Sequence, residues 1–191
     1  LVKKKKIVLD LSKKINYNSL SLFSSDKTIS IHIRNINNID TDFIQNREYL
    51  NKEKHSFYVN LIQNLKKNHV DHEIHVFSQG ELKEFQFLEP FKIQLHLNTP
   101  LIETFYHLMT SKILVTANSS LSWTAHLFGL NEKVYARLNF FHSWYLGTIL
   151  LSKSGKPLSK ILSFILIQLN RIRIFFSFFK IKLKRLVVGH K

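Results

Sequence analysis

The sequence contains no cysteine, and it has no acidic residue after Glu132. The absence of cysteine excludes disulfides, thiolate zinc sites and thiol nucleophiles, and it favours a reducing compartment such as the cytoplasm. The absence of acidic residues leaves 12 basic side chains uncompensated in residues 133–191, whereas residues 1–132 carry 16 basic and 13 acidic residues. The net charge of +15 is therefore concentrated in a cationic C-terminal segment.

Several fingerprints of nucleotide, metal and membrane binding are also missing. Neither the GxGxxG motif of dinucleotide-binding folds nor the GxxxxGK[ST] phosphate loop occurs, so any phosphate must be held in another way. The ten histidines show no HExxH or comparable ligand spacing, and we therefore expect no metal site. The tail from Pro157 to Lys191 contains no stretch that reaches the roughly 18 uncharged residues of a transmembrane helix. Leu1 is followed closely by Lys3–Lys6, and we expect no signal peptide.

The composition, 45% hydrophobic and 13% aromatic, is that of a globular domain, and the apolar periodicity predicts alternating strands and helices. We expect strands at Lys5–Leu11, Thr28–Arg34, Glu73–Phe77, Lys92–Leu97, Ile113–Val115 and Lys133–Ala136. We expect helices at Lys52–Asn68, at Leu101–Met109 and from about Leu121 to Phe128, with a helical turn near Leu82–Phe85. Thr99 should cap the second helix, with Pro100 in its first turn. This alternation indicates an α/β fold with a mainly parallel sheet.

The strand expected at Thr28–Arg34 carries two candidate site residues. Its three isoleucines share one face, and the polar residues between and after them share the other. His32 and Arg34 therefore point the same way near the carboxyl end of the strand, which is where parallel sheets bind ligands. The alternative for Arg34 is an ion pair with Asp40 or Asp42, and the alternative for His32 is a satisfied position in the core.

The strand expected at Ile113–Val115 runs directly into a hydroxyl-rich helix start. Its apolar run is typical of a strand covered on both faces, and Asn118 and Ser119 are good N-cap residues. The first helical N–H groups should lie at Ser119–Ser122, beside three serine hydroxyls. Such a helix N-terminus attracts an anion. The alternative is an ordinary capped helix that binds nothing.

Four segments of the chain stand in an informative order. They are Ile29-Ser-Ile-His-Ile-Arg34, His75-Val-Phe-Ser-Gln-Gly80, Leu97-Asn-Thr-Pro-Leu-Ile-Glu-Thr-Phe-Tyr-His-Leu-Met109 and Lys112-Ile-Leu-Val-Thr-Ala-Asn-Ser-Ser-Leu-Ser-Trp123. In this order they resemble the donor-binding half of the α-1,2-fucosyltransferase family and its uncharacterised bacterial relatives. That family has a strand ending in His-x-Arg-Arg-Gly-Asp, a later strand ending in a short polar loop, and a Ser-Ser-Phe-Ser helix start. The resemblance covers about Thr28 to Tyr145.

The resemblance implies the nucleotide-sugar-binding, Rossmann-like half of a GT-B glycosyltransferase. Such an enzyme inverts the anomeric carbon, needs no metal or other cofactor, and transfers fucose from GDP-fucose to a glycan or glycolipid acceptor. The resemblance further implies that Arg34 is the catalytic residue on the donor diphosphate and that His32 contacts the nucleotide. The other donor-binding positions that it implies are Ser78, Gln79, Asn118, Ser119, Ser120 and Ser122.

Differences from the family leave alternatives open. Asn35, Ile36 and Asn37 replace the Arg-Gly-Asp of the family, and Ser78 and Gln79 stand where characterised relatives place an Asp that reads guanine. The acceptor-binding half is reduced to the residues before the first isoleucine strand, so we expect a fragment or a remnant. A catalytically inactive or truncated domain is therefore one alternative. A basic nucleic-acid-binding module, supported only by the charge, ranks last, and we expect no nucleic-acid partner.

The chain is expected to comprise three parts. Residues 1–27 are a remnant or linker, residues 28–150 form the nucleotide-sugar-binding domain, and residues 151–191 form a basic, amphipathic, helical tail. From Pro157 onward the tail mixes Phe, Ile and Leu with Lys and Arg, which suits an anionic membrane surface. The alternative is a helix that packs on the missing half with its basic residues pointing outward. We expect a cytoplasmic protein, located at the membrane periphery if the tail binds lipid.

Overall fold

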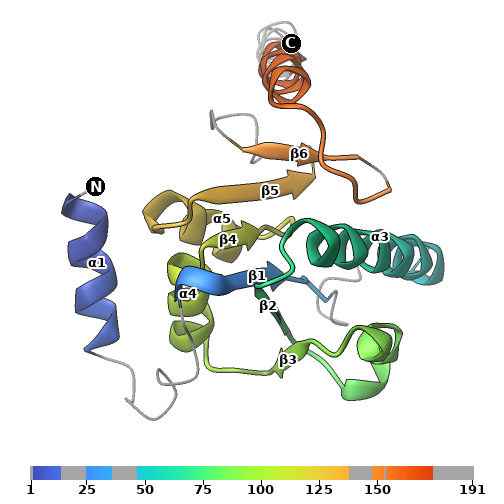
Figure 1. Cartoon of the computed structure of the whole chain (residues 1–191), viewed down its shortest axis with the longest axis horizontal. Coiled ribbons are helices and arrows are strands. Elements are labelled where there is room, and N and C mark those ends of the chain that lie inside the picture. The colour runs from blue at the N-terminus through green and yellow to red at the C-terminus, as the bar shows by residue number, and fades with distance from the viewer. Residues whose placement is uncertain (1, 14–24, 36–46, 138–147, 153, 174–191) are drawn as a thin grey trace, which may run out of the picture.

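A six-stranded parallel sheet forms the centre of the molecule (Figure 1). The computed structural model describes residues 2–13, 25–35, 47–137, 148–152 and 154–173. The strands are β1 (Thr28–His32), β2 (Glu73–Ser78), β3 (Gln94–Leu97), β4 (Ile113–Val115), β5 (Lys133–Arg137) and β6 (Ile149–Leu151). Their order across the sheet is β3-β2-β1-β4-β5-β6. The predicted α/β class and the Rossmann-like parallel sheet are thereby confirmed.

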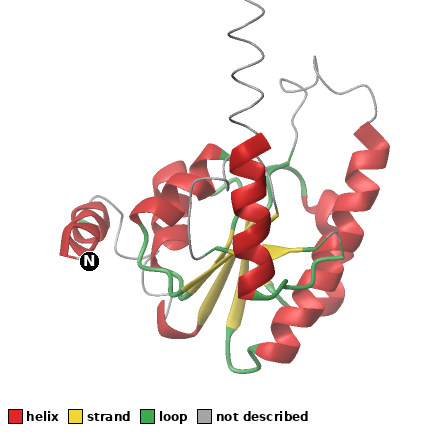
Figure 2. Ribbon diagram, turned by 90° about the horizontal axis from the view of Figure 1, so that it is seen from above, coloured by secondary structure: helices red, strands yellow, loops and turns green. Residues whose placement is uncertain are grey.

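Helices cover both faces of this sheet (Figure 2). They are α1 (Val2–Ser12), η1 (Ser25–Lys27), α3 (Arg47–Asn68), η3 (Leu82–Phe91), α4 (Leu101–Thr110), α5 (Ser120–Phe128) and a helix at residues 160–173. One sheet face packs against α3 and η3, around the isoleucines of β1. On the other face Phe77, Leu114 and Val134 pack against α1, α4 and α5. Burial on both faces is what the near-continuous apolar strands require.

The central strand β1 shows the predicted alternation of its side chains. Ile29, Ile31 and Ile33 are each 1% exposed or less and belong to the core beneath α3. Ser30 faces the opposite side, where its hydroxyl donates a hydrogen bond of 3.3 Å to the backbone carbonyl of His107 in α4. Because residues two apart in a strand share a face, His32 lies on the α4 side as well.

The strand predicted at Lys5–Leu11 is wrong, because this segment belongs to helix α1. Val8 is buried in the core beside α4 and α5, and Ile7 and Leu11 pack against the same core. These three positions are one and three residues apart, which places them on a single helical face. The Lys4 ammonium also donates to the carbonyl of Gly129 at 3.2 Å, next to the end of α5. Tertiary packing of that narrow face therefore decides the structure of a segment that lacks clear periodicity.

Two other local predictions differ from the structure. Pro100, and not Thr99, occupies the N-cap position of α4, and the N–H of Thr104 donates to the Pro100 carbonyl at 2.9 Å. Proline is suited to this place because a helix start leaves the first N–H groups unused. Strand β6 was not predicted, since a run of three apolar residues has no readable period.

The outer edge of β6 is closed by the chain that follows it. The N–H of Leu158 donates to the Leu150 carbonyl at 2.8 Å, and Pro157 forms an antiparallel bridge with Leu151. The N–H of Leu150 donates to the Ser163 hydroxyl, in the helix at residues 160–173, at 3.0 Å. The sheet thus runs across the boundary expected at residue 150, and the start of the tail is hydrogen-bonded to it. Closure of this kind removes an open strand edge.

Candidate functional site

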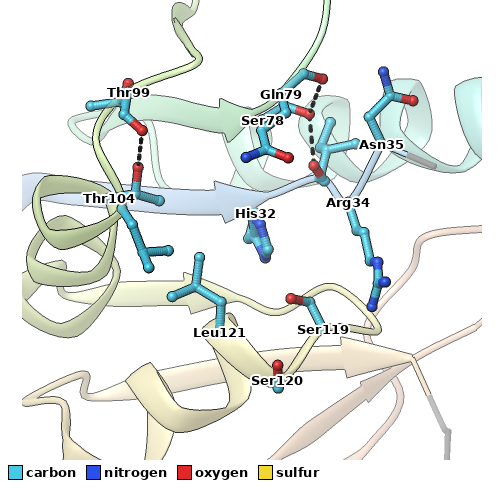
Figure 3. Close-up of a pocket in the computed structure, with 12 residues that line it drawn as sticks. His32, Arg34, Asn35, Ser78, Gln79, Thr99, Thr104, Ser119, Ser120 and Leu121 are labelled. Atoms are coloured by element: carbon cyan, nitrogen blue, oxygen red, sulfur yellow. Dashed lines mark hydrogen bonds between the residues drawn. The ribbon is translucent and has the colours of Figure 1, made fainter. Parts of the chain in front are cut away.

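A pocket with a volume of about 310 Å³ opens at the carboxyl ends of the central strands (Figure 3). Strands β2 and β3 lie on one side of β1, and β4, β5 and β6 lie on the other. The chain therefore reverses direction across the sheet between β1 and β4, and open parallel sheets bind ligands at such a reversal. The pocket is lined by His32, Ile33, Arg34, Asn35, Ser78, Gln79, Thr99, Leu101, Thr104, Ser119, Ser120 and Leu121.

The end of β1 supplies the basic side of the pocket. His32 is buried, whereas Arg34 is exposed at the rim. The Arg34 Nη1 donates to the backbone carbonyl of Asn118 at 3.4 Å, so the guanidinium reaches the turn between β4 and α5. This contact holds a cation beside the start of a helix. The alternative partners Asp40 and Asp42 lie outside the described residues.

The start of α5 forms the wall beside Arg34. Ser119 is the N-cap residue, but its hydroxyl makes no capping hydrogen bond. The first helical bond joins the Trp123 N–H to the Ser119 carbonyl at 3.2 Å, so the N–H groups of the three residues between them precede the helical hydrogen-bond ladder. These N–H groups and the helix dipole give this end of α5 a positive potential. Ser119 and Ser120 both line the pocket.

Ser122 lies beneath this wall and does not line the pocket. Its side chain is fully buried, and its oxygen accepts the N–H of Ala117 at 3.2 Å. The same hydroxyl lies 3.4 Å from the carbonyls of Ala117 and Ser119. Ser122 thus fixes the turn between β4 and α5, which in turn places the serines above it.

The ends of β2 and β3 form the opposite wall, which Asn98 holds in place. The Asn98 side-chain amide donates to the Gly80 carbonyl at 3.0 Å, and its oxygen accepts the Gly80 N–H at 3.1 Å. Gly80 has a φ of 124°, a conformation that suits only glycine. Ser78 donates to the carbonyl of Ile33 at 2.7 Å, which joins this wall to β1. Gln79 is thereby presented at the pocket from a fixed loop.

The structure brings together six of the eight residues predicted for the site. His32, Arg34, Ser78, Gln79, Ser119 and Ser120 all line the pocket. Asn118 contributes its backbone carbonyl to Arg34, and Ser122 supports the turn from below. The eight positions come from three separate segments of the chain, so their convergence depends on the strand order.

Sequence reasoning did not identify the part of the pocket contributed by the turn from β3 into α4. Thr99, Leu101 and Thr104 line the pocket there, and the Thr104 hydroxyl donates to the Thr99 carbonyl at 3.4 Å. The signal was present, because Thr99 and Pro100 mark a helix start after a predicted strand. The same rule that selected the ends of the other strands applies to this one. Asn35 was also missed, and its amide donates to Glu84 at 3.1 Å.

The pocket is polar and favours an anionic ligand. Among the described residues that line it there is one permanent cation, Arg34, and no carboxylate. The other polar side chains of the pocket are His32, five hydroxyl residues and the amides of Asn35 and Gln79. Across the described part of the chain, no group of three or more His, Asp or Glu side chains is placed to hold a metal ion. An anion bound here would be held by the guanidinium, the hydroxyls and the helix N–H groups.

Three histidines and one phenylalanine stack on the α4 side of the sheet. The rings of His75 and His96 lie 5.2 Å apart, and Phe77 stacks on His96 at 4.6 Å and on His107 at 5.6 Å. His75 Nδ1 and His96 Nε2 are 3.0 Å apart and share a hydrogen bond. Burial, together with the charge of the neighbouring imidazoles, lowers the pKa of His96 and of His107 to about 4 in each case. We call His75, His96 and His107 the histidine column.

The histidine column should make the fold sensitive to mild acid. Because the folded pKa of His107 lies below the ordinary value of about 6.5, the unfolded chain takes up its proton first. The contribution of neutral His107 to the free energy of unfolding is therefore fully present above pH 6.5. It is lost as the pH falls toward 4, and the loss for this one group reaches about 3 kcal/mol. Thermal unfolding measured across this range should show a falling midpoint, and the variant His107→Phe should show a flatter dependence. Identical pH dependence in parent and variant would contradict this assignment.

No protein-family model matches the chain, and no curated protein matches it.

Proposed function

We propose that this chain is the donor-binding domain of an inverting glycosyltransferase, and that the pocket holds the diphosphate of a nucleotide sugar, GDP-fucose. One observation carries the proposal. Arg34 and the serine-rich start of α5 converge on a single pocket at the reversal point of a Rossmann-like sheet. The proposed sugar and base rest on the sequence resemblance to the donor half of fucosyltransferases, whereas the proposed diphosphate binding rests on the residues of the pocket.

The geometry suits the charge that develops during glycosyl transfer. The acceptor hydroxyl gives up its proton to a base or to water as its oxygen attacks the anomeric carbon from the face opposite the leaving group. The bond from that carbon to the phosphate oxygen breaks, and the configuration inverts. The electron pair of that bond stays on the departing diphosphate. Arg34 can form paired hydrogen bonds to phosphate oxygens, and the N–H groups of α5 can donate hydrogen bonds to the oxygens that gain this charge. In this proposal these groups take the role that a metal ion takes elsewhere, so transfer proceeds without one.

The nucleoside is proposed to lie toward β2. In sheets of this order, residues at the end of the second strand contact the ribose. Ser78 and Gln79 stand there, and Gln79 offers both a donor and an acceptor from a loop held by Asn98. His32 lies between this wall and the start of α5 (Figure 3). The pocket volume of about 310 Å³ is within the range of about 300–1,000 Å³ that small-molecule sites occupy.

Calorimetric titration of the full chain tests donor binding. GDP and GDP-fucose should bind with a dissociation constant that does not change when EDTA replaces Mg²⁺. ADP, UDP and inorganic pyrophosphate serve as competitors that separate base recognition from diphosphate recognition. If pyrophosphate binds as tightly as GDP, the site recognises the diphosphate and not the base. If none of these compounds binds, the donor assignment is wrong.

Catalysis needs a separate measurement, because a domain that has lost activity could still bind its donor. Release of GDP from GDP-fucose should be followed with and without glycan acceptors. Turnover would establish an active transferase or donor hydrolase. Tight donor binding without turnover would instead identify a binding domain that needs the acceptor half supplied by further chain or by a partner.

A further inference from the structure

The helix at residues 160–173 exposes an apolar surface. Several of its large apolar side chains are about half exposed or more, namely Ile161 at 75%, Leu169 at 56%, Phe164 and Ile172 at 53%, Ile165 at 46% and Leu162 at 43%. At about 3.6 residues per turn, Ile161, Ile165 and Ile172 fall within about 40° of one another around the helix axis. They form the centre of an outward stripe. By the same spacing Gln168 also falls on this side of the helix, between Phe164 and Ile161 around the axis. Scattered exposed apolar residues are normal in proteins, whereas six on one side of a single helix indicate a binding surface.

The opposite face of this helix is fixed to the sheet. Ser163, Ile167 and Asn170 are buried, with at most 6% of each exposed. The Ser163 hydroxyl accepts the N–H of Leu150 in β6 at 3.0 Å. In Figure 1 the helix stands beyond β6, at the edge of the sheet opposite β3. Turning the apolar stripe inward would break the contact with β6, so the stripe stays on the outside.

Basic residues border the stripe on both sides. By the same helical spacing, Lys160 and Arg171 lie on one flank and Arg173 on the other, and all three are exposed. Lys156 is exposed in the loop before the helix. The Arg171 Nη1 donates to the side-chain oxygen of Gln168 at 3.2 Å. No acidic residue follows Glu132 in the sequence, so residues 133–191 carry a net positive charge. Long basic side chains at the borders of an apolar face can reach phosphate groups while their stems stay on the apolar layer.

From this arrangement we propose that the helix at residues 160–173 lies flat on an anionic lipid bilayer, with its stripe in the acyl boundary and its flanking cations at the headgroups. Charge complementarity selects this occupant. Two copies of the chain meeting through the stripe would bring like charges together with no carboxylate between them, which opposes self-association. No helix in the described part of the chain is long and apolar enough to cross a bilayer. The inference is independent of donor binding, since neither the stripe nor its flanks line the pocket.

Vesicle flotation of the full chain tests this proposal. The probes are vesicles of phosphatidylcholine alone and vesicles that also contain phosphatidylserine. We expect binding to the second kind and a marked weakening with added salt, because the attraction is electrostatic. Equal binding to both kinds of vesicle, or to neither, would overturn the proposal.

Paired variants separate the contribution of the stripe to vesicle binding from nonspecific hydrophobic adsorption and from the effect of net charge. Phe164→Ser with Leu169→Ser should weaken binding at least tenfold, whereas Val70→Ser with Leu82→Ser, at positions 82% and 65% exposed, should not. The double variant Lys156→Ser with Lys160→Ser should weaken vesicle binding about fivefold for each charge removed, which corresponds to about 1 kcal/mol per basic residue. The control variant Lys5→Ser with Lys6→Ser on α1 should weaken vesicle binding less.

Two readouts keep these variants informative. GDP titration should be unchanged in all of them, so a failure of the donor proposal and a failure of this one are distinguishable. Sedimentation should show the same mass for the parent and for the stripe variants. If the stripe variants shift a monomer–dimer equilibrium and leave vesicle binding unchanged, the surface joins two copies of the chain and the lipid assignment is wrong.

Discussion

Replacing Arg34 by alanine is expected to weaken GDP binding about 100-fold. A guanidinium that donates two hydrogen bonds to a diphosphate contributes about 1.5 kcal/mol or more through each, and about 3 kcal/mol corresponds to a factor of about 100 in affinity. Arg34 is exposed, and its guanidinium donates a long hydrogen bond of 3.4 Å to the Asn118 carbonyl. Its loss should therefore leave the thermal midpoint of the free protein nearly unchanged. Calorimetry measures the affinity, and circular dichroism monitors the fold.

Two further variants define what Arg34 does. Arg34→Lys keeps the charge but loses the paired donors, so its affinity should fall between those of the parent and the alanine variant. Arg137→Ala is the control, because it removes a cation that does not line the pocket. The Arg137 guanidinium lies at the end of β5 and stacks on the Phe57 ring at 4.8 Å. It should bind GDP like the parent. An Arg34→Ala variant that binds like the parent would remove the main support for the donor site.

Gly155→Ala is expected to destabilise the protein by about 3 kcal/mol. Gly155 has a φ of 73°, where any other residue costs about 1–2 kcal/mol. A Cβ atom there would lie 2.7 Å from the carbonyl oxygen of Phe57 and 2.9 Å from the backbone nitrogen of Leu61, both in α3. Because these are backbone atoms, the loop or the helix must move, which adds about 1–3 kcal/mol. For a chain of this length the thermal midpoint should fall by roughly 6–12 °C.

Ser154→Ala is the matched control for this change. It adds no atom and removes only an exposed hydroxyl that shares a 3.0 Å hydrogen bond with the Ser152 hydroxyl, so its midpoint should stay close to that of the parent. GDP binding by folded Gly155→Ala protein should be retained, since the loop after β6 does not line the pocket. A glycine variant as stable as the parent would show that the loop does not approach α3 as closely as described.

The sequence was most informative where burial imposes a strong pattern. β1 alternates isoleucine with polar residues, and β4 is a short, wholly apolar run, so both strands were predicted close to their observed positions. The serine-rich start of α5 was also placed correctly, because N-cap residues stand directly before an apolar helix. These three elements carry most of the predicted pocket residues.

The remaining features depend on contacts that a single sequence does not display. α1 is helical because three of its apolar side chains pack against α4 and α5. The lysines around these side chains show no helical periodicity, so the sequence did not indicate a helix. The joining of two loops by Asn98 needs β2 and β3 to be neighbours, which only the strand order reveals. The walls contributed by Thr99 and Thr104 became recognisable for the same reason. Local patterns thus identified elements, and topology identified partners.

The reversal of the chain between β1 and β4 also constrains when a pocket can exist. Arg34 and Asn118, which meet across it, are separated by 84 residues in sequence. Bringing two such segments together costs loop entropy before any contact compensates for it, so parallel sheets with distant partners fold slowly. We therefore expect the pocket to be among the last features to form as the chain folds and among the first to disappear as it opens. A ligand that binds there stabilises only the completed sheet and thereby selects against partly folded chains.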